Sequence, residues 1–277
     1  MSDMSPVAHA ATNLVNRSLQ QVRLFFIALQ FFTRLPIPLW VGFESDWLHH
    51  ASRYFPLVGI VVAAMTSAVY ALAAWIWPQA IAVLLSTIAG IYLTGAFHED
   101  GFADVCDGFG GGSTPQRVLE IMKDSRIGAY GAIGIGLLLA LKCVVLSNLP
   151  VQAVIVALFI AHPLSRLFAA ALIWLLDYAR AEGKAKPLAQ HMSAAEFLIG
   201  AVTASIPVMV AGLTGRLSWY VILVGTAAAA AAAVWLSRFF LRRIGGYTGD
   251  CLGAVQQVAE VAFYLGVLAC MRPGVPH

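Results

Sequence analysis

The sequence predicts an all-α fold, a polytopic transmembrane bundle of about six to eight membrane-embedded helices. Three observations predict it. Of the 277 residues, 60% are hydrophobic and only 11% are charged, whereas soluble domains carry about 25% charged residues. The mean hydropathy is +0.80. The apolar residues also form continuous runs of about 18 residues or more, which is enough to cross a bilayer as a helix.

Six of these apolar runs are clear, and each ends in Trp, Pro, Asn or charged residues of the kind found at membrane interfaces. They cover residues 54–77, 80–97, 127–147, 151–176, 197–213 and 219–236. Two further segments are weaker. Residues 22–32 are apolar but short and flanked by Arg and Pro, so an interfacial helix and a span both fit them. Residues 258–270 fit either a short final span or a buried helix.

The pattern predicts one membrane-embedded domain at residues 22–272, after an N-terminal extension at 1–21 and before a tail at 273–277. Threading the six clear runs places most of the 17 Lys and Arg residues on one side of the bilayer. By the positive-inside rule that side is cytoplasmic, and the segment 98–126 lies there. The net charge is only +3, and no basic patch interleaved with aromatic residues predicts a nucleic-acid partner. The expected partner of the outer surface is the lipid bilayer.

Acidic residues concentrate on that cytoplasmic side, where six of the 14 lie between Glu99 and Asp124. Asp100, Asp104 and Asp107 follow an i, i+4, i+7 pattern, which places them within an arc of about 60° on one helix face. Carboxylates so close repel one another, and a bound Mg²⁺ removes this conflict while leaving positions for substrate phosphates. A solvated acidic loop is the alternative, but the register of the aspartates favours a metal site. Glu99 is a weaker candidate ligand, because it points off that face.

Residues that suit a phosphate follow the aspartates. Three glycines at 110–112 allow backbone N–H groups to approach a ligand, and Thr114 before a proline predicts a helix start. A helix N-terminus beside glycines can hold phosphate, so Gly111 is a candidate binding residue, although a flexible loop has the same composition. Lys123 and Arg126 then place two cations near the aspartates. Both are candidates to clamp a pyrophosphate, and a basic membrane anchor is the alternative.

Ionisable residues within predicted spans need a reason, since a central Arg costs about 2.5–3.5 kcal/mol on insertion scales. His162 and Arg166 are one helical turn apart and share a face, which lines a cavity or forms a structural ion pair. Arg166 is a candidate to meet an aspartate or a substrate phosphate. Lys142 fits a snorkelling or structurally paired side chain. The glycine-rich stretch 245–254 returns Asp250 to the cytoplasmic side, where it is a further candidate for the site.

At these residues the sequence resembles the adenosylcobinamide-GDP ribazoletransferases, also called cobalamin 5′-phosphate synthases. The resemblance runs in order from about residue 25 to residue 268. Its most specific parts are the aspartate block and the block Lys-Asp-Ser-Arg-Ile-Gly. Arg34 belongs to the first of the matching segments. These segments are residues 32–38, 54–59, 98–108, 121–128 and 249–254.

The resemblance implies the last stage of vitamin B12 nucleotide-loop assembly. Adenosylcobinamide-GDP reacts with α-ribazole or its 5′-phosphate, giving adenosylcobalamin or its 5′-phosphate and releasing GMP. On this interpretation Mg²⁺ bridges the pyrophosphate, and one aspartate accepts the hydroxyl proton. The candidate metal ligands are Glu99, Asp100, Asp104 and Asp107. The candidate catalytic residues are Asp104, Asp107, Asp124 and Asp250. The candidate substrate-binding residues are Arg34, Gly111, Lys123, Arg126 and Arg166.

The resemblance also implies a multi-pass protein of the bacterial cytoplasmic (inner) membrane with its active-site loops facing the cytoplasm. A homo-oligomer, or a complex with other late cobalamin-pathway enzymes, is a further implied partner. Three other classes compete with this interpretation. A lipid-forming CDP-alcohol phosphotransferase has similar aspartate spacing but needs an Arg where this chain has Asp104. An ion-coupled transporter expects carboxylates in mid-span, and a scaffold explains none of the clustered acids.

Overall fold

The computed structural model describes residues 6–42, 44, 47–179 and 191–271, with side chains from residue 18 onward. These residues are mainly helical, and the described ranges contain no strand beyond an isolated bridge between Tyr178 and Tyr247. The all-α prediction is therefore confirmed. The predicted tail at 273–277 lies outside the described residues, as do residues 1–5 of the predicted N-terminal extension.

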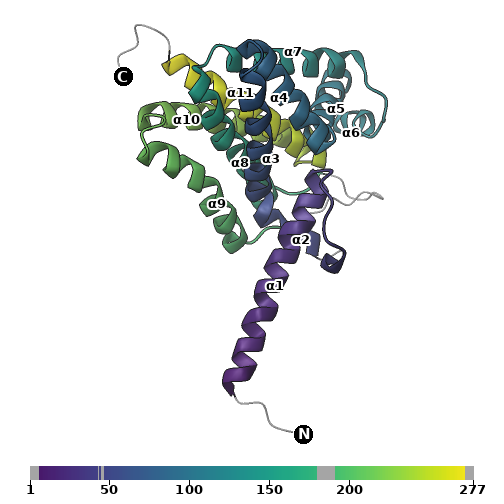
Figure 1. Cartoon of the computed structure of the whole chain (residues 1–277). Helices are drawn as coiled ribbons and strands as arrows, with labels where there is room; N and C mark the ends of the chain where they lie inside the picture. The colour runs from purple at the N-terminus through teal and green to yellow at the C-terminus, as the bar shows by residue number, and fades with distance from the viewer. Residues whose placement is uncertain (1–5, 43, 45–46, 180–190, 272–277) are drawn as a thin grey trace.

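The elements follow one another through short connections. In chain order they are α1 (Pro6–Phe32), η1 (Leu39–Val41), α2 (Trp47–Ala51), η2 (Ser52–Tyr54), α3 (Phe55–Ala74), α4 (Gln79–Thr94), α5 (Phe97–Gly111), α6 (Pro115–Ile121), α7 (Ala129–Ser147), α8 (Val151–Leu175), α9 (Ala194–Leu213), α10 (Trp219–Ile244) and α11 (Gly249–Cys270). Figure 1 shows α3, α8 and α11 in the middle of the bundle, with α9 and α10 on one side and α5 and α6 on the other.

Six helical segments in the described part of the chain are long and apolar enough to cross a membrane. They are Trp47–Ala74, α7, α8, α9, α10 and α11. Five of the six clear runs are thus confirmed as candidate spans, and so is the prediction of a multi-pass bundle. The weak segment 258–270 is the end of α11, which has 22 residues and begins at Gly249. Polar side chains in the first half of α11 face the bundle interior, so its apolar run is shorter than the helix.

For the remaining predicted run, residues 80–97, the predicted C-terminal end was wrong. α4 stops at Thr94, because Gly95 and Ala96 both adopt left-handed backbone angles, with φ of 64° and 58°. Left-handed residues cannot continue a right-handed helix. α5 then leaves at 90° to α4, and the pair together counts as up to a seventh span. Because of this bend, the acidic segment lies on a separate helix, α5, which packs on α7 and α11.

α1 is one continuous helix of 27 residues that crosses the predicted boundary between residues 21 and 22. Leu24, Ile27 and Ala28 are buried near its C-terminal end, where α1 packs on α2 and α3. Its N-terminal part projects away from the bundle (Figure 1). Among the described residues, α1 does not meet the length and hydropathy test for a span. Residues 22–32 are therefore the bundle-bound end of a longer helix.

Glycines bring the central helices into close contact. A Cβ on Gly59 of α3 would lie 2.7 Å from Pro163 of α8, and a Cβ on Gly266 of α11 would lie 2.8 Å from the Cα of Gly225 in α10. Small residues at such crossings are typical of membrane helices, where van der Waals packing drives association. α8 and α11 form the centre of the bundle, since 72% of each apolar window is buried. α5, which carries the acidic residues, packs on α11 and is positioned by it.

Candidate functional site

The three predicted aspartates lie along one side of α5. The helix runs without a break from Phe97 to Gly111, so their i, i+4, i+7 spacing does place them on one helix face, called here the acidic face. Asp100 is exposed, Asp104 is half-buried and Asp107 is buried. The acidic face therefore begins at the surface near the α4–α5 bend and becomes covered toward α7.

Asp107 joins α5 to the first turn of α7. Its Oδ2 accepts a hydrogen bond from the Gly128 N–H at 2.7 Å, and its Oδ1 accepts one from the Gly131 N–H at 2.8 Å. The first N–H groups of a helix have no acceptor within the helix, and a negative charge there is favoured by the helix dipole. Asp107 thus caps α7 from a different helix. Each oxygen keeps a further lone pair, so the metal role of Asp107 stays a prediction.

The cap requires glycine at position 131. A Cβ there would lie 2.3 Å from Asp107 Oδ2, whereas a Cβ on Gly136 of the same helix would meet nothing within 4 Å. We expect Gly131→Ala to displace the carboxylate and to destabilise the protein by about 1–3 kcal/mol, the range for a buried polar group left unpaired. Gly136→Ala, the matched control, should gain about 0.5–1 kcal/mol from helix propensity. Thermal unfolding in detergent measures both, and equal stability of the two variants would contradict the capping role.

The N-terminus of α11 brings Asp250 against α5. A Cβ on Gly101 would lie 3.1 Å from the Cα of Asp250, and a Cβ on Gly253 would lie 3.0 Å from a backbone oxygen at the start of α5. The two helices therefore touch backbone to backbone beside Asp100. The glycine-rich stretch was predicted to return Asp250 to the cytoplasmic side, and the structure places its backbone beside α5. Its role in the site stays a prediction. The acidic face consequently lies between the first turns of α7 and α11.

The glycine run completes α5, with Gly112 as its C-cap. At two of the three positions, close packing leaves no room for a larger side chain. A Cβ on Gly110 would lie 2.6 Å from the Tyr130 ring, and a Cβ on Gly112 would lie 2.6 Å from Val118. Gly111 is exposed and is the member of the run that stays a predicted phosphate contact.

The turn between α6 and α7 exposes the predicted cations. α6 begins at Pro115 as predicted, and the Oγ1 of its N-cap, Thr114, accepts a hydrogen bond from a backbone N–H at 3.2 Å. Lys123 and Arg126 are exposed beyond it. Arg126 donates to the two carboxylate oxygens of Asp124 at 3.0 and 2.7 Å, and this pairing lowers the pKa of Asp124 to about 2. A substrate phosphate would have to compete with Asp124 for Arg126.

The pair predicts a specific titration. Because the folded-state pKa of Asp124 is lowered, the ion pair is complete above the ordinary pKa and is lost as the pH falls toward about 2. We expect Arg126→Gln to raise the midpoint toward about 3.9, the unperturbed value. Carboxyl ¹³C NMR of labelled aspartate follows this titration, with Lys123→Gln as the matched loss of charge that should leave it unchanged. The pair is refuted if Arg126→Gln leaves the Asp124 midpoint where it was.

Arg34, a predicted substrate-binding residue, lies over the bend between α4 and α5. Its backbone N–H donates to the Leu93 oxygen at 2.8 Å, and its guanidinium lies 5.2 Å from the Tyr92 ring centroid. A Cβ on Gly95 would lie 3.1 Å from its Nε. Arg34 therefore packs against the bend that positions the acidic face. Its contact with a substrate stays a prediction.

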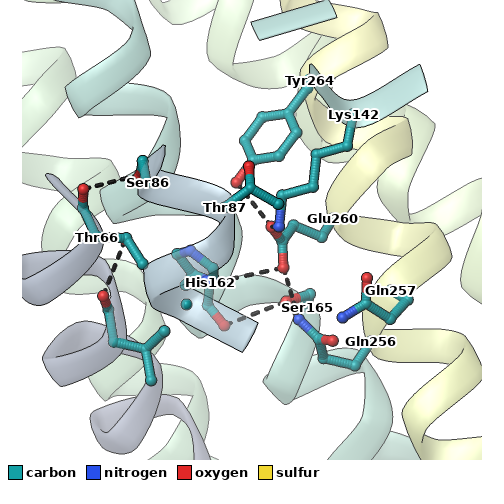
Figure 2. A network of polar contacts seen from close by, with 12 residues as sticks. Thr66, Ser86, Thr87, Lys142, His162, Ser165, Gln256, Gln257, Glu260 and Tyr264 are labelled. Carbon is teal, nitrogen blue, oxygen red and sulfur yellow. Dashed lines mark hydrogen bonds and ion pairs between the residues drawn. The ribbon is translucent and has the colours of Figure 1, made fainter. Parts of the chain in front are cut away.

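A buried polar network occupies the bundle interior between α7, α8 and α11 (Figure 2). Glu260 is at its centre, where it accepts from Lys142 Nζ at 2.6 Å, Gln256 Nε2 at 2.7 Å and the Tyr264 hydroxyl at 3.0 Å. His162 Nδ1 lies 3.3 Å from Oε2, the carboxylate oxygen that also accepts from Gln256. Lys142 is thus structurally paired, one of its two predicted interpretations. Glu260 was not predicted from the sequence, although two cations buried in spans were a signal that an acidic partner exists.

Glu99 and Arg166 belong to this network and not to the acidic face. Gln257 Nε2 donates to Glu99 Oε1 at 2.8 Å, and Arg166 donates to the His162 oxygen at 3.0 Å. Both line a cavity of about 20 Å³, which suits a water molecule and not a phosphate group. Glu99 Oε2 and Arg166 Nε have no hydrogen-bond partner among the described residues. The structure therefore does not bring Glu99 together with the three aspartates, nor Arg166 with the basic turn.

The oxygen donors of the acidic face suit Mg²⁺, which is usually held by one or two carboxylates together with waters and substrate phosphates. Asp100 and Asp104 offer two carboxylates on neighbouring turns. Within the described ranges, no group of three or more His, Cys, Asp and Glu side chains is gathered closely enough to hold an ion. A metal at this face would therefore need waters or substrate oxygens to complete its coordination.

Fold and site together define a multi-pass, all-α membrane protein with an acidic helix face set between the first turns of two other helices. The sequence profile of the cobalamin-5-phosphate synthase family matches residues 24–268. The chain belongs to this family. The resemblance stated from the motifs is confirmed, and with it a transferase of cobalamin biosynthesis.

Several relatives named adenosylcobinamide-GDP ribazoletransferase are similar over nearly the whole chain. The protein from Leptothrix cholodnii is 47% identical over 257 residues, which cover 91% of this chain and 97% of the relative. The relative from Shewanella frigidimarina is 44% identical and that from Ralstonia pickettii 46%, with 91% and 88% of this chain covered and 96% and 94% of the relatives. No solved structure was found to match the chain.

Proposed function

We propose that this protein joins adenosylcobinamide-GDP to α-ribazole, or to its 5′-phosphate, and releases GMP in a Mg²⁺-dependent reaction that yields adenosylcobalamin or its 5′-phosphate. The names of the similar relatives support these substrates. The observation that carries the site assignment is the acidic face of α5, which is set between the first turns of α7 and α11.

The proposed transfer exchanges one phosphorus–oxygen bond for another. A ribose hydroxyl oxygen bonds to the phosphorus joined to cobinamide, the bond from that phosphorus to the oxygen of the GMP phosphate breaks, and the hydroxyl proton passes to a carboxylate. Catalysis of such transfers depends mainly on positioning and on neutralising charge. Mg²⁺ bound at the site would supply Lewis-acid stabilisation of the phosphate oxygens.

The proposed roles follow from where each side chain lies. Asp100 and Asp104 are the accessible carboxylates of the acidic face and are the proposed main metal ligands, with Asp107 already oriented by α7. Lys123 forms no ion pair among the described residues, which supports it as a phosphate contact. Asp124 is a weak general base, since its pKa of about 2 lies far from neutral pH.

We propose that this face is cytoplasmic in a bacterial inner membrane. The positive-inside rule supports the orientation, because the basic end of α10 lies on the same side as the acidic face. Arg243 of α10 donates to the Gly112 oxygen at the end of α5 at 2.9 Å. Both the acidic face and these basic residues would then reach soluble substrates from the cytoplasm.

The proposal is tested with detergent-purified protein, adenosylcobinamide-GDP and α-ribazole 5′-phosphate, first with Mg²⁺ and then with EDTA. We expect GMP and a corrinoid product with the mass of adenosylcobalamin 5′-phosphate, and loss of both when EDTA is added. A folded sample that releases no GMP would refute the proposed reaction. GMP release that is unaffected by EDTA would refute the metal requirement alone.

A further inference from the structure

An apolar cleft lies on the bundle surface between α8 and α9, with α3 forming part of its wall. Its volume is about 370 Å³, within the range of small-molecule sites. Its walls are mostly aliphatic and aromatic, and include Ile60, Phe159, Ile206 and Val210. All four belong to candidate membrane spans. The cleft therefore lies at the depth of lipid acyl chains.

α9, which forms one wall of the cleft, is a peripheral helix of the bundle. Only 22% of its apolar window is buried, against 72% for α8, and Figure 1 shows α9 at the edge of the molecule. Its N-terminal end is fixed by Glu196, which completes a capping box with Ser193 and pairs with Arg53. Pro207 lies in the middle of α9, where its missing N–H removes one helical hydrogen bond. The half of α9 that begins at Ile206 lines the cleft.

A cation lies at one end of this cleft. Arg216 is the charged residue of the lining and sits in the turn between α9 and α10, next to Gly215 with its φ of 66°. It is exposed, and it takes part in none of the ion pairs among the described residues. Trp219 and Tyr220, which follow it, are about half exposed. Aromatic side chains of this kind mark the level of the lipid headgroups.

We propose that the cleft binds one phospholipid, with an acyl chain between α8 and α9 and the headgroup phosphate on Arg216. An apolar cleft inside a span excludes a soluble polar ligand, and the unpaired guanidinium at headgroup level favours a phosphate over a neutral headgroup. Arg guanidinium and phosphate form two parallel charge-assisted hydrogen bonds when they meet. The lipid would fill the space that α9 leaves against α8.

This lipid site is remote from the proposed transferase site. α10 has 26 residues and spans about 40 Å. It begins just after Arg216 and ends where Arg243 holds the end of α5. The two sites therefore lie at opposite ends of α10, and lipid binding uses no residue assigned to phosphoryl transfer. The inference holds or fails independently of the proposed reaction.

The test titrates phosphatidylglycerol into delipidated protein in detergent and counts bound lipid by native mass spectrometry. We expect one retained lipid in the unmodified protein and about tenfold weaker retention in Arg216→Gln, the effect of losing a charge-assisted contact. Val210→Trp, which fills the cleft and leaves Arg216 in place, should weaken retention as well. Arg242→Gln removes another exposed Arg, at the other end of α10, and this variant should bind the lipid as the unmodified protein does.

Size-exclusion profiles and thermal unfolding establish that each variant is folded. Diacylglycerol, which has the same acyl chains without a phosphate, should be retained about as weakly by the unmodified protein as phosphatidylglycerol is by Arg216→Gln. Equal retention of the two lipids by the unmodified protein would overturn the role of the phosphate. Retention of phosphatidylglycerol unchanged by both Arg216→Gln and Val210→Trp would overturn the site itself.

Discussion

Asp104→Asn is expected to reduce the turnover number for GMP release by about 10²–10⁴-fold while the protein still inserts and folds. Asp104 is the half-buried middle member of the acidic face. Asparagine keeps the shape of the side chain but removes the negative charge that a cation or a proton would need. The loss should therefore appear in turnover measured at saturating substrate and saturating Mg²⁺.

Glu120→Gln is the matched control for this experiment. Glu120 lies on α6 close to the acidic face in sequence, but its carboxylate is exposed and forms a surface pair with Arg117 at 3.1 Å. Surface pairs of this kind contribute about 0–1 kcal/mol, so turnover should be nearly normal. Near-normal activity of Asp104→Asn in a folded sample would remove Asp104 from the site and leave the metal assignment without its main support.

Glu260→Gln is expected to destabilise the protein by about 3–5 kcal/mol, because it leaves the buried Lys142 ammonium without its counter-charge. The two side chains are 1% and 9% exposed and lie 2.6 Å apart, so little solvent screening reduces the effect. Gln keeps the side-chain volume and can still hydrogen-bond Tyr264 and Gln256. The loss therefore reports the charge and not a cavity.

Equilibrium unfolding in mixed micelles measures this effect, with Lys142→Met added to separate charge from packing. Removing both charges takes away the uncompensated ammonium, and replacement of a whole buried pair by apolar groups is often neutral. We expect the double variant to recover most of the stability lost in Glu260→Gln. A double variant that is less stable than Glu260→Gln alone would show that the pair is not coupled as the structure indicates.

The two sides of α5 explain why catalysis and stability are separable in these predictions. Asp100 and Asp104 lie on the acidic face, while Glu99 points into the polar network and bonds to Gln257 of α11. The Glu99 carboxylate thus anchors α5 to the bundle interior, while the carboxylates of Asp100 and Asp104 lie on its outer side. Changes in the network should lower stability first, and changes at Asp100 and Asp104 should lower turnover first.

Periodicity alone predicted most of the acidic face. The spacing of Asp100, Asp104 and Asp107 requires only that the segment be helical, and it correctly placed Glu99 off their face. Thr114 before a proline likewise predicted the start of α6, because N-cap chemistry is local in sequence. The candidate spans were equally predictable, since each consists of a long apolar run whose ends carry interfacial residues.

Contacts between distant segments could not be predicted in this way. Asp107 as the cap of α7, and Glu260 as the partner of Lys142, each depend on which helices pack together. The bend after Thr94 depends on two left-handed residues, one of which is Ala96 and gives no sequence signal. Arg166 lines a cavity with His162, as their shared helix face predicted, but the small volume of about 20 Å³ depends on tertiary packing and could not be predicted. Its contact with a substrate stays a prediction.

Binding of Mn²⁺, followed by EPR of detergent-purified protein in the presence of adenosylcobinamide-GDP, tests most directly whether the acidic face of α5 holds the metal. Mn²⁺ replaces Mg²⁺ at oxygen-rich sites. We expect tight binding in the unmodified protein and in Glu99→Gln, and binding weakened by about tenfold or more in Asp100→Asn and Asp104→Asn. Binding lost in Glu99→Gln but retained in both aspartate variants would contradict the assignment and move the metal into the buried network.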